Sequence, residues 1–95
     1  MIKDVNVLNL YRKIICSLLC INKNTKNENL RLKSSIYLDK YLEQYKLYND
    51  KCICLLDNIE DVISFCNSCY EDKDVFDFAE DLEYGLKELF DIVNK

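Results

Sequence analysis

The sequence predicts an all-α fold, a small four-helix bundle formed by a single domain over residues 1–95. Two observations lead to this prediction. β-Turns and hairpins depend on glycine and proline, and the chain contains one glycine, Gly85, and no proline. Apolar side chains also recur at steps of three and four residues along most of the chain, which is the period of an amphipathic helix. The alternative is a helical hairpin that completes its core by dimerisation.

The first two helices are expected in the basic half of the chain. The first covers residues 4–21, with Asp4 as its N-cap. A polar stretch follows, in which Thr25 and Glu28 have the spacing of a capping box. The second helix is therefore expected over residues 27–48.

The last two helices are expected after a weak break at Asn49 and Asp50, where Asp50 would cap the third helix. That helix is expected over residues 51–69 and, because its apolar stripe is wide, to be the most buried. Asp72 or Asp74 would cap the fourth. Two apolar stripes define these helices: Cys52, Leu56, Ile59, Ile63, Cys66 and Tyr70 in the third, and Val75, Phe78, Leu82, Leu86, Leu89 and Val93 in the fourth.

Charge is divided unevenly between the two halves. Residues 1–51 carry ten Lys/Arg against five Asp/Glu, and residues 52–95 carry three against twelve. The acidic residues of the fourth helix either form a contact surface for a basic partner or are a solvated face attracted to the basic helices of the same chain. If they bind a partner, binding should weaken steeply with salt, and neutralisation of the carboxylates should abolish it. The candidate contact residues are Asp77, Asp81, Glu88 and Asp91.

A tyrosine stripe on the second helix is the other candidate contact surface. Its members follow one another at steps of four, four and three residues and therefore share one side of the helix. Tyrosine is enriched in interface hot spots, so the stripe suits a protein interface. The competing interpretation is that the rings fill the bundle core. The stripe consists of Tyr37, Tyr41, Tyr45 and Tyr48.

Six cysteines raise the question of metal binding. Two pairs, Cys16 with Cys20 and Cys66 with Cys69, would lie at the same end of an up-down bundle, where four thiolates can hold Zn²⁺. A zinc-stabilised structural or regulatory domain is therefore an alternative function. Small apolar packing is the favoured interpretation, because the N-terminus shows no secretory signal and we expect reduced thiols in the cytoplasm. No cofactor is expected.

The residue types that are missing argue against an enzyme. The chain has no histidine and only one glycine, so it lacks the commonest general base and cannot form a glycine-rich phosphate loop. A nucleic-acid-binding module that uses the basic half is a further alternative. It is disfavoured because the net charge is −4. No membrane segment is expected.

The amino-acid composition indicates an AT-rich genome, which could be that of a low-GC bacterium or its phage, a large DNA virus or a protozoan parasite. The chain contains eleven lysines, two arginines and ten asparagines, which is typical of an AT-rich genome. Together, these features predict a non-enzymatic module that binds another protein, encoded by a phage or virus to inhibit or modulate a host protein in the cytoplasm of the producing or host cell. Self-association as a homodimer is compatible with it.

Overall fold

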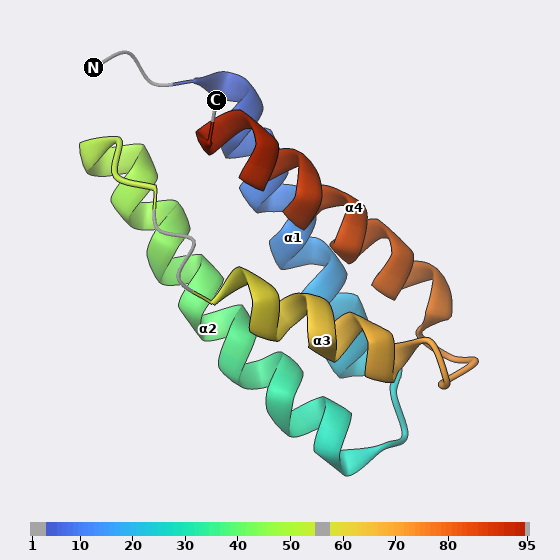
Figure 1. Cartoon of the computed structure of the whole chain (residues 1–95). Helices are drawn as coiled ribbons and strands as arrows, with labels where there is room; N and C mark the ends of the chain where they lie inside the picture. The colour runs from blue at the N-terminus through green and yellow to red at the C-terminus, as the bar shows by residue number, and fades with distance from the viewer. Residues whose placement is uncertain (1–3, 55–57, 95) are drawn as a thin grey trace.

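The computed structural model describes residues 4–54 and 58–94. This part of the chain forms four helices, which confirms the predicted all-α four-helix bundle (Figure 1). None of these helices is both long and apolar enough to cross a membrane. The helices are α1 (Val5–Asn24), α2 (Glu28–Lys51), α3 (Ile59–Cys69) and α4 (Phe76–Val93).

The helices pack around one apolar core. Helix α1 lies between α2 and α4, and the short α3 packs against α4 and α2 (Figure 1). Each helix contributes one buried stripe, as its periodicity predicts. Fully buried members of the core include Tyr11, Ile14, Leu18, Tyr41, Val62, Cys66, Leu82, Leu86 and Leu89.

The N-cap predicted for α1 is confirmed. The Asp4 carboxylate accepts the backbone N–H of Asn6 at 2.9 Å. The helix continues beyond the predicted residue 21, and Thr25 is its C-cap. Asparagine and lysine can form a helical turn that does not pack in the core. The start of the polar stretch therefore did not mark the C-terminal end of α1.

The capping box predicted for α2 is wrong. Asn27 is the N-cap, and its side-chain oxygen accepts the N–H of Asn29 at 2.9 Å. The Thr25 hydroxyl instead accepts the N–H of Asn27 and donates to the Asp72 carboxylate, at 3.1 and 2.7 Å. Thr25 therefore ties the connection between α1 and α2 to the turn before α4, and Glu28 is simply the first residue of its helix.

The predicted start of the third helix at residue 51, with Asp50 as its cap, is wrong. Helix α2 continues through Lys51, and Cys52 ends it with a left-handed backbone of φ 56°. Glycine usually occupies such a position. Because the residue here is a cysteine, the sequence did not indicate that α2 ends at this point. Helix α3 begins only at Ile59. The expected core position Leu56 lies outside the described residues.

The predicted caps of α4 are also wrong. Val75 is the N-cap residue, and it makes no side-chain capping bond. The Asp72 carboxylate accepts the N–H of Asp74 at 3.0 Å and so stabilises the preceding turn rather than the helix end.

Gly85 allows α1 and α4 to approach closely. A Cβ atom at this position would lie 3.3 Å from Cγ1 of Ile14, which is fully buried. Glycine in a helix interior costs about 1 kcal/mol relative to alanine. We attribute its presence here to the close contact with Ile14.

Burial of several weak acids makes stability sensitive to alkali. Desolvation raises the pKa of the Cys69 thiol to about 12, and that of Cys66 further. Burial and a hydrogen bond to Glu83 raise the pKa of Tyr70 to about 12. The folded protein therefore keeps protons that the unfolded chain loses above its ordinary pKa values.

We expect the free energy of unfolding to fall as the pH rises above about 9, by up to about 1.4 kcal/mol per pH unit for each of the two thiols, and Tyr70 should add to this slope only above about pH 10. Below pH 9 these groups are protonated in both states and should contribute no pH dependence. Urea unfolding under reducing conditions at pH 7.5, 9 and 10.5 measures the slope. A Cys66→Ala, Cys69→Ala variant should show a shallower slope; an equal slope would contradict the assignment to the thiols.

Candidate protein-binding surface

The tyrosine stripe of α2 does not form an outer surface. Tyr41 is 0% exposed and Tyr48 is 7% exposed, while Tyr37 and Tyr45 are half-buried against the core. The stripe faces inward because α1 packs on this side of α2. A partner therefore cannot contact the stripe as a whole.

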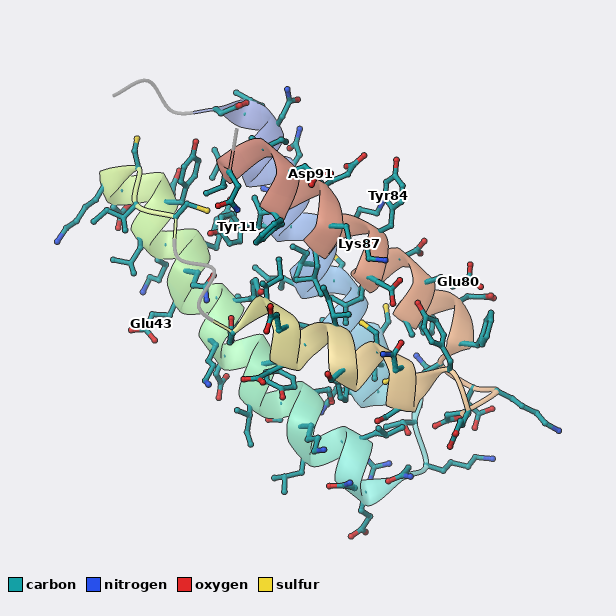
Figure 2. The ribbon with its side chains drawn as sticks, viewed as in Figure 1. Tyr11, Glu43, Glu80, Tyr84, Lys87 and Asp91 are labelled. Atoms are coloured by element: carbon teal, nitrogen blue, oxygen red, sulfur yellow. The ribbon has the colours of Figure 1, made fainter. Side chains whose placement is uncertain are left out.

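Tyr11 of α1 is the centre around which this stripe packs. Its ring centroid lies 6.3 Å from that of Tyr41, 6.5 Å from that of Tyr45 and 6.0 Å from that of Tyr48. Figure 2 shows Tyr11 inside the bundle. Its hydroxyl lies 2.9 Å from the sulfur of Cys54, and burial raises the pKa of Tyr11 far above its ordinary value. These rings therefore hold α1 and α2 together.

The four cysteines of the alternative zinc site are not brought together. Cys16 is exposed on α1 and Cys20 is half-buried, whereas Cys66 and Cys69 are buried on α3. The pairs stay apart because α3 packs against α4 and α2 rather than against α1. Among the described residues, no group of three or more His, Cys, Asp or Glu side chains is placed to hold a metal ion.

The acidic residues of α4 do lie at the surface. Asp77, Asp81 and Asp91 are exposed, and Glu88 is half-buried. Glu80 joins them, and Figure 2 shows Glu80 and Asp91 projecting outward from α4. We define the acidic face as the set of carboxylates on this side of the helix: Asp77, Glu80, Asp81, Glu88 and Asp91.

Tyr84 occupies the middle of the acidic face and is not among the contact residues predicted from the sequence. Its side chain is 58% exposed. Every carboxylate of the acidic face lies three, four or seven residues away, which places them around the ring on one side of the helix. The sequence does indicate that Tyr84 lies at the surface, because this residue falls outside the apolar stripe formed by residues such as Leu82 and Leu86.

Two neighbours fix the position of the Tyr84 ring. The Nζ atom of Lys13 lies 4.9 Å from the ring centroid, a cation–π contact from α1. The hydroxyl donates a hydrogen bond to Glu88, and this bond raises the pKa of Tyr84 above its ordinary value. The ring is thus held in place on the surface and not buried.

The acidic face is not neutralised by close contacts within the protein. In the part of the chain that the structure describes, the only salt bridge joins Lys87 to Glu83 at 3.0 Å, within α4 itself. None of the carboxylates of the acidic face forms an ion pair with α1 or α2 there. Lys13 of α1 lies beside this face, over the Tyr84 ring, but it forms a salt bridge with none of these carboxylates.

The helix dipole does not explain the acidic face. Asp77 lies in the first turn of α4, where a negative charge gains about 0.3–1 kcal/mol. Asp91 lies in the last turn, where the dipole disfavours an anion, and that turn contains no basic residue. Stability of the helix alone would favour a lysine or arginine at this end.

Comparison of the chain with protein-family models, curated proteins and solved structures finds no match. The acidic face combines exposed negative charges with an exposed aromatic ring, an arrangement suited to binding a cationic surface.

Proposed function

We propose that this protein is a non-enzymatic protein-binding module whose acidic face binds a basic surface of another protein. One observation carries the proposal. The exposed ring of Tyr84 is surrounded by five carboxylates, and none of them forms a salt bridge with the described residues. Lysines and arginines of a partner would pair with the carboxylates, and the ring would supply the buried contact that an interface needs at its centre.

The density of charge on the acidic face indicates the kind of basic surface that fits it. At 1.5 Å per residue, α4 extends about 21 Å from Asp77 to Asp91. Five carboxylates over this length, with four intervals between them, lie about 5 Å apart on average, a wider spacing than the 3.4 Å per phosphate of one nucleic-acid strand. A basic surface with lysines or arginines at this spacing would therefore be complementary to the acidic face.

The composition of the chain supports a role as a modulator of a host protein. A lysine-rich, asparagine-rich chain is typical of an AT-rich genome, and phage and viral genomes are among those with this bias. The small size and the absence of histidine fit a protein that acts by occupying a surface and not by catalysis. We place its action in the cytoplasm of the producing or host cell.

The proposal is tested by affinity capture from a lysate of the source or host cell with three versions of the chain. The first is the natural sequence. The second removes charge from the acidic face by Asp77→Asn, Asp81→Asn and Asp91→Asn. The third is a matched control that removes the same charge from the outer side of α2, by the substitutions Asp39→Asn, Glu43→Gln and Asp50→Asn, all at exposed positions.

A partner that binds the natural chain and the α2 variant, but not the α4 variant, is the expected result. Binding should also weaken steeply between 50 and 300 mM salt, because exposed charge pairs are screened over about 10 Å at 0.1 M. Equal capture by the two variants, or binding that does not respond to salt, would contradict the proposal. Circular dichroism establishes that both variants are folded.

A further inference from the structure

A shallow apolar groove lies beside the acidic face, between α3 and α4. The two helices meet at the turn that joins them and diverge towards the start of α3 and the end of α4 (Figure 1). The groove that opens between them has a volume of about 310 Å³. It is lined by Ile59, Glu60 and Ile63 of α3 and by Lys87, Phe90 and Asp91 of α4.

Specific contacts hold α3 and α4 together at one end of the groove, and the groove is open at the other end. Near the turn, the Tyr70 ring packs on Phe76 with centroids 5.3 Å apart. The Tyr70 hydroxyl donates to the Glu83 carboxylate at 3.1 Å, and Glu83 also accepts from Lys87 at 3.0 Å. The described residues at the open end show no comparable polar contact between the helices, and apolar side chains line the space.

The walls of the groove are apolar and its rim is acidic. Phe90 is 44% exposed, Ile63 is half-buried, and Ile59 lies beneath them at 5% exposure. Glu60 and Asp91 are exposed carboxylates at the edge. Lys87, the basic residue of the rim, is already paired with Glu83. A ligand with apolar side chains flanked by cations is therefore complementary to the groove.

Asp91 connects the groove to the acidic face, since it belongs to both. One ligand can therefore cover the two surfaces together. An amphipathic helix presents apolar side chains one turn apart and can carry basic residues on either side of them. The volume of the groove suits a few such side chains, since it is at the low end of the range for small-molecule pockets.

We propose that the α3–α4 groove receives the apolar side chains of a basic amphipathic helix in the partner, while the acidic face pairs with its lysines or arginines. This inference rests on the proposed function, because it assumes that the partner binds beside α4. Charge complementarity and the shared Asp91 favour this occupant over a second copy of the chain. The outer side of α2 carries both acidic and basic residues and does not provide a cationic helix.

The probe is a synthetic 18-residue peptide of leucine and lysine with its leucines on one helical face. A permuted peptide of the same composition, without an apolar face, is the control. Calorimetry measures binding at 50 and 300 mM salt. The test variant carries Ile63→Ser and Phe90→Ser; the matched control carries Leu32→Ser and Ile36→Ser, which removes two exposed apolar side chains from α2. Methyl NMR of Ile59 and Ile63 in the natural chain provides a readout that needs no variant.

We expect the amphipathic peptide to bind at least tenfold more tightly than the permuted one and to shift the methyl signals of Ile59 and Ile63. The groove variant should lose at least tenfold in affinity, and the α2 variant should lose none. Equal binding of the two peptides, unshifted methyl signals, or a dimer of the free protein that Phe90→Ser abolishes would each overturn the inference.

A third variant separates this inference from the proposed function. Asp77→Asn with Asp81→Asn changes the acidic face and leaves the groove intact. If it weakens both peptides equally while the groove variant weakens neither, the acidic face binds cations and the groove has no part. If it leaves the natural partner bound as before, the proposed function itself fails.

Discussion

Replacing Tyr84 by alanine is expected to lower the affinity for the partner by roughly 10–100-fold and to leave the free energy of unfolding almost unchanged. Tyrosines at the centre of an interface commonly contribute 2 kcal/mol or more, and about 1.4 kcal/mol corresponds to a tenfold change. The stability should change little because the side chain is 58% exposed and lies outside the core. Titration of the purified complex measures the affinity, and urea unfolding measures the stability.

Tyr84→Phe separates the ring from its hydroxyl. The phenylalanine keeps the aromatic surface over Lys13 and loses only the hydrogen bond to Glu88. We expect a much smaller loss of affinity than for alanine, because the hydrogen bond to Glu88 lies within the chain and the aromatic surface that a partner would cover is retained. An alanine variant that binds like the natural chain would remove Tyr84 from the interface and would leave the carboxylates as the only candidates.

Replacing Tyr11 by alanine is expected to reduce the free energy of unfolding by about 3–5 kcal/mol, the range measured for large aromatic side chains in protein cores. Tyr11 is 0% exposed and contacts the three tyrosine rings of α2 named above. Small domains have only about 5–15 kcal/mol of stability in total. The variant should therefore be partly unfolded at 37 °C, which circular dichroism and urea titration can measure.

Tyr11→Phe is the matched control for this substitution. It keeps the ring contacts and loses the hydrogen bond to Cys54, which spans 2.9 Å. We expect a loss of about 0.5–1.5 kcal/mol. If Tyr11→Ala cost no more than Tyr11→Phe, the ring contacts between α1 and α2 would not contribute to stability, and this description of the core would be wrong.

The helices could be predicted from the sequence because their buried side chains follow a helical period. Leu82, Leu86 and Leu89 lie in the core as that period requires. The helix ends could not be predicted as well, because they depend on single hydrogen bonds and backbone angles. Cys52 ends α2 in a left-handed conformation that its side chain does not signal. Similarly, Thr25 bonds to Asp72, a residue 47 positions away, and does not cap its own helix.

The candidate site was predicted in part. The carboxylates of α4 lie at the surface as an amphipathic helix requires. Sequence spacing also placed the α2 tyrosines on one side of their helix, but it does not tell which side faces a neighbour; the packing of α1 decides this. The groove beside Phe90 depends on the divergence of α3 from α4, and a period along the chain contains no information about that angle.

The most direct test of the central claim is to measure which carboxylates the partner covers. Carbodiimide labelling of the free protein and of the purified complex, read by mass spectrometry, reports the reactivity of each carboxylate. We expect Asp77, Asp81 and Asp91 to lose reactivity in the complex, while the exposed Asp39, Glu43 and Asp50 of α2 react equally in the free protein and in the complex. Unchanged labelling of α4 together with protection of α2 would contradict the claim.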